Sequence, residues 1–317
     1  MSSRRYTVAF LAGDGVGPEL TAEASRALAA VSRSHGFAVE DLHLPFGGEA
    51  LVRFGNRLPL ATQRDLARAD AVLVAAPGEP AFQVVKNAVD PVVTVTRVAH
   101  GDSATLVIGP SEREFENAAI RAAFLLAARR RARLTSVGGS EEWTELVADE
   151  AAADARGIAV HHRTFGEALN AFGSGEHLDV VVADTNLHVA LADALAVLGG
   201  TADAVARGWL PEAGAGLFAP AEVLDPTVAG YGAVDPASML LAVSHLLAAG
   251  LREHAAATTL ERAVVAAAAA GYGPGARRAS SLAATTRTFT DAVIARLSEN
   301  RTDLELLSEI TNDEVRP

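Results

Sequence analysis

The sequence has no cysteine and only one lysine, Lys86, among its 317 residues. Without cysteine the chain cannot form disulfides, bind a metal through thiolates or use a cysteine nucleophile. Positive charge is scarce as well, because 27 basic residues stand against 39 acidic ones and the net charge is −12. This balance argues against nucleic acid or an anionic membrane as a partner, since both attract basic surfaces.

Long apolar runs are also missing. No segment offers the roughly 18 uninterrupted apolar residues that a membrane-spanning helix needs. The opening "MSSRRYTVAF" has two arginines and a short apolar run, but Asp14 interrupts it before the core of a signal peptide could form. We therefore expect a cytoplasmic protein that binds no membrane.

Apolar residues are abundant in short runs. Half of the residues are hydrophobic, so the chain can bury a large core as one domain or as two lobes. Runs such as "YTVAFLA", "DAVLVAAP" and "DVVVADT" are typical of strands covered by helices on both faces. The pattern indicates an α/β fold with sheets flanked by helices. Helices are expected at 18–36 and at about 113–131, 140–155, 187–198, 236–250, 257–270 and 287–298.

A glycine-rich turn follows the first expected strand. In "LAGDGVGPEL", Gly13, Gly15 and Gly17 are spaced G-x-G-x-G rather than G-x-G-x-x-G. No acidic residue stands at a following strand end where a dinucleotide-binding fingerprint would place one. Glycine in such a turn often serves only positive φ and close packing of helix on strand. The turn taken alone therefore does not indicate a Rossmann fold.

Longer sequence motifs are more specific indicators of a family. "GDGVGPELTAEA" resembles the opening of the β-decarboxylating dehydrogenases, the family of isopropylmalate and isocitrate dehydrogenases, which reads G-D-G-I-G-P-E. "LPFGGEAL" and "LPLATQRDLARADAVLVAAPGEP" are similar to the family's next segments. "FAPAEVLDPTVAGYGAVDPASMLLAVSHLL" is similar to its F-E-P-V-H-G-S-A-P-D-I-A-G-K-G segment, and "RTFTDAVIARL" to its final helix. The resemblance covers most of the chain.

This resemblance implies a two-lobed isopropylmalate/isocitrate dehydrogenase-like fold with a cleft between the lobes. The large lobe would comprise 1–97 and 217–317, and the middle lobe 98–216. It also implies a homodimer formed through middle-lobe helices, with 140–155 and 187–198 as candidates. "TLVIGPSERE" passes directly into an expected helix, so the family's β-arm and its catalytic tyrosine are predicted to be missing.

The resemblance also implies a chemistry that the aligned residues do not support. Family members oxidise a 2-hydroxy acid with NAD or NADP, decarboxylate the product, and hold a divalent metal with three aspartates. The three metal positions fall here on Val189, Asp193 and the neighbourhood of Phe165, so only the remnant Asp193 survives. The family's aspartate and the general acid/base lysine that follows it fall on Gly138 and Gly139 in that order, and glycine cannot move a proton.

The substrate and cofactor positions are depleted as well. Arg97 matches one substrate arginine, whereas another falls near Gly109. His188 is a candidate acid/base group, and Lys86 is interpreted as a solvated charge. The catalytic candidates are thus Arg97, His188, Asp193 and Glu222, and the remnants of the cofactor site are Asp14, Val16 at the nicotinamide-facing position, Thr227 and Asp235.

These observations leave three candidate functions. The first is a degenerate binding or accessory protein that has lost NAD- and magnesium-dependent oxidative decarboxylation, either alone or with a catalytic paralogue. The second is a repurposed enzyme with non-redox chemistry on a small acid in the same cleft. The third is a divergent NAD-dependent dehydrogenase of a 2-hydroxy acid. A small acidic ligand suits the first two, and NAD and magnesium would be required only if the family site survives.

Overall fold

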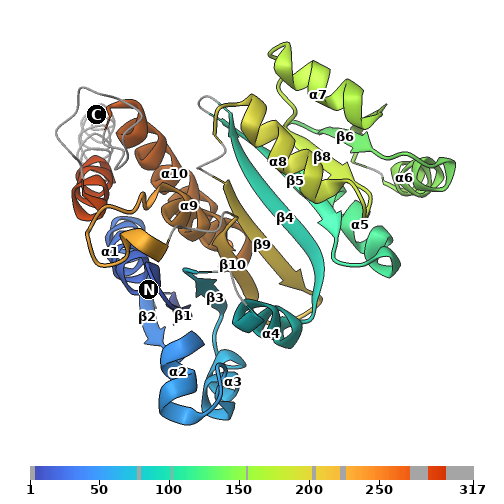
Figure 1. Cartoon of the computed structure of the whole chain (residues 1–317). Coiled ribbons are helices and arrows are strands. Elements are labelled where there is room, and N and C mark those ends of the chain that lie inside the picture. Colours follow the sequence, from blue (N-terminus) through green and yellow to red (C-terminus); the bar gives the residue numbers. More distant parts are fainter. Residues whose placement is uncertain are drawn as a thin grey trace, which may run out of the picture.

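The computed structural model describes residues 4–76, 80–100, 103–154, 156–201, 205–221, 226–271 and 285–297. Within them a ten-stranded mixed sheet forms the centre of the molecule, and helices cover both of its faces (Figure 1). The strand order is β2-β1-β3-β10-β9-β4-β5-β8-β6-β7. The strands are β1 Arg5–Leu11, β2 Ala38–His43, β3 Ala71–Val74, β4 Pro91–His100, β5 Ser103–Pro110, β6 Arg133–Val137, β7 Ala159–Arg163, β8 Val180–Ala183, β9 Val205–Pro211 and β10 Gly216–Pro220.

The pairing divides the sheet into two parallel ends and an antiparallel centre. β2, β1, β3 and β10 pair in parallel, as do β5, β8, β6 and β7, whereas β10–β9, β9–β4 and β4–β5 are antiparallel. Elements from both chain ends lie on one side of β4 and β9, and those from the middle lie on the other (Figure 1). The α/β class with helix-flanked strands is confirmed, and both halves share one continuous sheet. The exact lobe boundaries stay a prediction.

The helices begin and end at residues suited to those positions. α1 begins at Gly17 with Pro18 in its first turn, and it ends before Gly36, whose φ of 71° closes the helix in the left-handed conformation. The other helices are α2 Gly47–Phe54, α3 Leu60–Leu66, α4 Pro80–Val89, α5 Glu116–Ala128, α6 Glu141–Ala153, α7 Phe165–Gly173, α8 His188–Leu198, α9 Ala237–His245, α10 His254–Ala269 and a last one at 286–297, with short turns η1 Arg113–Phe115, η2 Pro226–Val228 and η3 Leu246–Gly250.

Side-chain alternation along the strands separates two faces of the sheet. On one face α1, α9 and α10 cover the part of the sheet built from the chain ends, and α5 and α6 cover the rest. On the opposite face α4 packs near β9 and β10, and α8 packs on β4 and β5. Strand β9 contributes Ala206 to the first face and Trp209 to the second. The second face positions the candidate site.

Two further features bear on the predictions. Only residues 111–115 separate β5 from α5, and they hold one short 3-10 turn rather than a pair of arm strands. In the ranges described above, no helix is both long enough and apolar enough to cross a bilayer.

Candidate functional site

A group of polar side chains lies on the sheet face between α4 and α8. Thr94 and Thr96 of β4 pair with Trp209 and Arg207 of β9 in antiparallel register. Because alternate residues of a strand share a face, these side chains lie together on the side of the sheet that α4 and α8 cover. We call Lys86, Thr96, Asp193, Arg207 and Trp209 the α4–α8 site.

Arg207 is the central charge of the α4–α8 site. Its Nη2 donates to Asp193 Oδ1 at 3.0 Å, and its Nε donates to Thr96 Oγ1 at 3.1 Å. The Arg207 side chain is 13% exposed, whereas that of Asp193 is 57% exposed. The Arg207 guanidinium is therefore hydrogen-bonded both to the sheet and to α8, while the Asp193 carboxylate is partly exposed to solvent. Such charge-assisted bonds fix geometry as well as charge.

Lys86 approaches the same group from α4. Its ammonium lies 6.0 Å from the centroid of the Trp209 ring, and Phe82 packs edge-on against that ring at 5.1 Å. Burial lowers the pKa of Lys86, the charge of Arg207 lowers it further, and the carboxylate of Glu112 partly opposes both effects. The interpretation of Lys86 as a solvated charge is corrected here, because the side chain is half-buried beside a second cation.

His188 packs beneath α8 instead of facing an open site. The residue is 6% exposed, and its Nδ1 lies 3.2 Å from the carbonyl oxygen of Asp184. A Cβ placed on Gly109 of β5 would lie 2.1 Å from His188 Cγ, so the imidazole fills the space of a side chain at position 109. Burial lowers the pKa of His188 and keeps the ring neutral. This placement suits a packed histidine better than the predicted acid/base group.

Arg97 is not part of the α4–α8 site. It follows Thr96 on β4 and so projects from the opposite face, where it forms an ion pair with Glu261 of α10. Burial lowers the pKa of Arg97 to about 9, and the charge of Arg130 adds to that effect. The sequence comparison placed a substrate arginine here, but strand alternation turns this guanidinium away from Asp193. Arg97 and Asp193 therefore do not face the same ligand.

The residues at the aligned metal positions do not fit a divalent cation. Asp193 is bonded to a guanidinium, Val189 offers no oxygen, and Phe165 begins α7. Throughout the described part of the chain, no group of three or more histidine, aspartate and glutamate side chains could hold a metal ion. Magnesium and calcium need several oxygen ligands, so the family's metal chemistry has no support in this donor set.

The position aligned with the family's aspartate is filled by a tryptophan, whereas a Cβ on Gly139, at the lysine position, would have open space around it. Gly138 follows β6, and a Cβ there would lie 2.0 Å from Trp143 Cδ1. The indole is fully buried, and its Nε1 donates to Ser136 Oγ at 3.0 Å. A cavity of about 200 Å³ remains beside it, lined also by His162, Arg163 and Glu167 among others. No side chain longer than glycine fits at position 138 while this indole stays in place.

The glycines of the turn at residues 13–17 are required by the backbone conformation and by close packing. Gly13 and Gly15 adopt φ of 69° and 62°, and a Cβ on Gly17 would lie 1.8 Å from the carbonyl oxygen of Ala12. Asp14 accepts the Gly48 amide at 2.7 Å, which ties this turn to the start of α2. Val16 was expected to face a nicotinamide, but it is 2% exposed within the core under α1.

The remaining cofactor remnants lie between η2 and α9. Thr227 is exposed within η2. The carboxylate of Asp235 accepts the amide of Ala237, the first residue of α9, at 2.9 Å. Glu222 lies outside the described residues.

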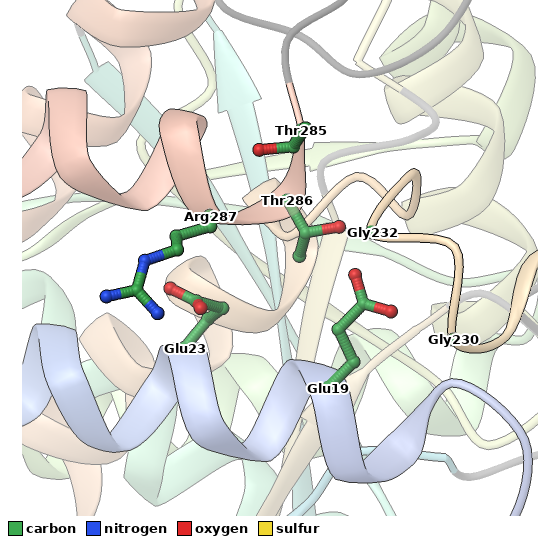
Figure 2. A pocket seen from close by; sticks show the side chains of 7 residues that line it. All are labelled: Glu19, Glu23, Gly230, Gly232, Thr285, Thr286 and Arg287. Carbon is green, nitrogen blue, oxygen red and sulfur yellow. The ribbon is translucent and has the colours of Figure 1, made fainter.

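A cavity of about 490 Å³ adjoins this segment (Figure 2). Glu19 and Glu23, one turn apart on α1, face the Gly230–Gly232 turn and the start of the last helix at 285–287. Glu23 is bonded to Arg26, whereas Glu19 Oε1 is buried and has no partner among the described residues. Two carboxylates against the guanidinium of Arg287 favour hydroxyl or cationic groups over phosphates.

Sequence reasoning missed Arg207 and misjudged Lys86. The stretch "VARGWLP" was not recognised as a strand, because glycine interrupts it and the alternation is short. Had it been read as one, the i, i+2 spacing of Arg207 and Trp209 would have placed a cation and an aromatic ring on one face. The alternation of side chains along this stretch was therefore the sequence signal that could have identified the site.

Comparisons with known proteins match the chain to one protein family. The model of the family described as "Isocitrate/isopropylmalate dehydrogenase" matches residues 7–100 and 98–293. Curated relatives include a 3-isopropylmalate dehydrogenase of Synechococcus sp. (strain CC9605), 28% identical over 86% of this chain and 93% of that protein. Another is the 3-isopropylmalate dehydrogenase of Yersinia pestis, 26% identical over 85% and 92%.

Solved structures share the fold. A β-decarboxylating dehydrogenase from Thermococcus kodakarensis superposes with a TM-score of 0.77 at 19% identity, covering 98% of this chain and 99% of that one. An isocitrate dehydrogenase from Methylococcus capsulatus gives a TM-score of 0.74, also at 19% identity, over 93% and 99%.

Proposed function

Because this chain belongs to the isocitrate/isopropylmalate dehydrogenase family, we propose that it keeps the family's fold, has lost metal- and NAD-dependent oxidative decarboxylation, and binds a small carboxylic acid at the α4–α8 site. In this role it is a binding or accessory protein. A repurposed non-redox enzyme is the alternative. The cytoplasmic location stays a prediction.

The observation that carries the proposal is the pairing of Asp193 with Arg207. A metal-dependent member needs that carboxylate for its cation, and a guanidinium bonded to it both occupies an oxygen and repels a second positive charge. With Lys86 nearby, the α4–α8 site has two cationic side chains and one partly solvated carboxylate. A planar guanidinium suits a carboxylate ligand through parallel hydrogen bonds.

Steric filling supports the loss of the aspartate beside the acid/base lysine position and of a substrate arginine. The ring of Trp143 occupies the space beside Gly138, and the ring of His188 occupies the space beside Gly109. Restoring aspartate at position 138 or arginine at position 109 would therefore require the ring beside it to move, whereas a Cβ at position 139 would meet no atom within 4 Å. At positions 138 and 109 the missing side chain has been replaced by packing.

We expect no NADH or NADPH to form when the protein is mixed with NAD or NADP, magnesium and 3-isopropylmalate or isocitrate. Calorimetric titration should instead detect binding of small mono- and dicarboxylates without magnesium. Arg207→Gln should weaken this binding by about ten- to one-hundred-fold, since a hydrogen bond to a charged group contributes roughly 1.5–3 kcal/mol. The matched control is Arg121→Gln, which removes an exposed guanidinium on α5.

Two results would contradict the proposal. Magnesium-dependent turnover of either hydroxy acid would move the divergent dehydrogenase to first place. Failure of every tested carboxylate to bind wild-type protein would remove the binding role and leave only the accessory one. Co-purification with a catalytic paralogue would favour that accessory role.

We also propose that the chain forms a homodimer through α8. This helix carries one charged side chain, Asp193, and it exposes Val189, Val197 and Leu198 although its inner face is already buried. A helix that is apolar all round is typical of burial on both sides. Val197→Asp should convert a dimer to a monomer in light scattering coupled to size exclusion, whereas Val52→Asp, at a still more exposed valine on α2, should not. A wild-type monomer would exclude this interface.

A further inference from the structure

We propose that Lys86 is a nucleophilic amine that forms an imine with a 2-oxo acid whose carboxylate is held by Arg207. The inference rests on the proposed carboxylate binding and adds a covalent step to it. It names the ligand class, a 2-oxo acid, and the residue that would react with it.

The geometry brings an amine and an anion clamp to one sheet face. Lys86 lies over the Trp209 ring, and Arg207 lies two residues before Trp209 on the same strand, so both cations lie on the sheet face that α4 and α8 flank. Arg207 is fixed by Thr96 and Asp193. Within the described ranges Lys86 has no carboxylate in ion-pair contact and no hydrogen-bond partner, so its Nζ is available to a ligand.

Two physical effects make this amine reactive. Partial burial against Phe82 and Trp209 disfavours the ammonium form, and the nearby guanidinium of Arg207 repels it. Both effects lower the pKa of Lys86 and raise the fraction of free amine at neutral pH. Desolvation and a neighbouring cation are the recognised means by which proteins activate lysine toward carbonyls.

The covalent step balances without a co-reactant. The Lys86 Nζ lone pair attacks the carbonyl carbon of the 2-oxo acid, and the carbonyl electron pair moves to oxygen. The two amine hydrogens leave with that oxygen as one water molecule, and a C=N bond joins Nζ to the ligand. No electron is gained or lost, so neither a nicotinamide nor a metal is needed.

A trapping experiment tests the inference sharply because Lys86 is the only lysine. Purified protein is incubated with pyruvate or 2-oxoglutarate and sodium cyanoborohydride, and peptide mapping by mass spectrometry locates the reduced adduct. We expect Lys86 to be labelled on the order of ten-fold faster than the α-amino group of the same chain, since the bound ligand is held beside it. Lactate and 2-hydroxyglutarate, which lack the carbonyl, should give no adduct.

Variants separate covalent reaction from binding. Lys86→Arg should abolish the side-chain adduct while keeping positive charge, and Arg207→Gln should slow labelling of Lys86 by about ten-fold or more. Calorimetry with 2-oxoglutarate is run in parallel. If the acid binds in an Arg207-dependent way and Lys86 is not labelled above the α-amino group, the inference is overturned and the proposed function stands. If neither binding nor labelling occurs, both are overturned.

Discussion

Glu261→Gln is expected to lower the free energy of unfolding by about 3–5 kcal/mol, because it leaves the Arg97 guanidinium buried without its carboxylate. The Arg97 and Glu261 side chains are 11% and 15% exposed. Among the described residues, Arg97 Nε is already buried without a hydrogen-bond partner. The neutral amide of the variant would not replace the lost negative charge.

The position of this ion pair explains why its loss should be felt throughout the molecule. Arg97 lies on β4, one of the strands at the centre of the sheet, and Glu261 lies on α10, which packs with α1 and α9. The pair therefore joins the central sheet to the helical layer built from the chain ends. Chemical denaturation monitored by tryptophan fluorescence and by circular dichroism should report one common shift of the midpoint.

Two further variants make this result interpretable. Arg97→Met with Glu261→Leu removes both charges, so it should regain most of the stability that Glu261→Gln alone loses, since apolar replacement of a buried pair is often neutral. Glu145→Gln, at an exposed site on α6, should change stability by less than about 0.5 kcal/mol. A Glu261→Gln protein as stable as the wild type would show that the Arg97–Glu261 pair contributes nothing to the free energy of unfolding.

The sequence predicted the main elements where local chemistry was sufficient. The helix expected at 18–36 is α1, Gly17–His35, and Gly36 closes it as predicted. Strands β3 and β8 were recognised because they are short, continuously apolar and fully buried. Strands β9 and β10 were missed. Gly208 and Gly216 interrupt their apolar pattern, and each glycine is required by the Phe218 ring, which would crowd a Cβ.

The site was harder to predict because strand register decides which face a side chain occupies. In "TVTRV", a shift of one residue exchanges Arg97 for Thr96, and with it the α10 side of the sheet for the α4–α8 side. Motif alignment alone does not resolve such a shift. Asp193 was singled out by aligning its segment with the family's metal-binding motif, but its partner Arg207 comes from a strand that none of the motifs in the sequence analysis covers.

Acidification should destabilise the fold through His245 by about 2 kcal/mol between about pH 7.5 and about pH 5. This residue is 4% exposed at the end of α9, and burial, followed by the charge of Arg97, lowers its pKa to about 3 from an ordinary value of 6.5. Above pH 6.5 both the folded and unfolded forms are neutral at this residue. Below pH 6.5 the unfolded chain binds a proton that the folded chain does not. The free energy of unfolding therefore falls by about 1.4 kcal/mol for each unit that the pH falls.

The readout is the slope of unfolding free energy against pH, not its absolute value. His245→Phe keeps a ring against Phe218 and should remove the part of this slope that His245 contributes, whatever its cost at neutral pH. His254→Gln, at an exposed histidine on α10, should leave the slope unchanged. The buried His188 contributes a slope of the same sign, because its pKa is lowered too, so some dependence should persist in His245→Phe. Equal slopes for wild type and His245→Phe would mean that His245 is protonated in the folded protein, and the neighbouring Arg97 would then have to tolerate a second buried cation.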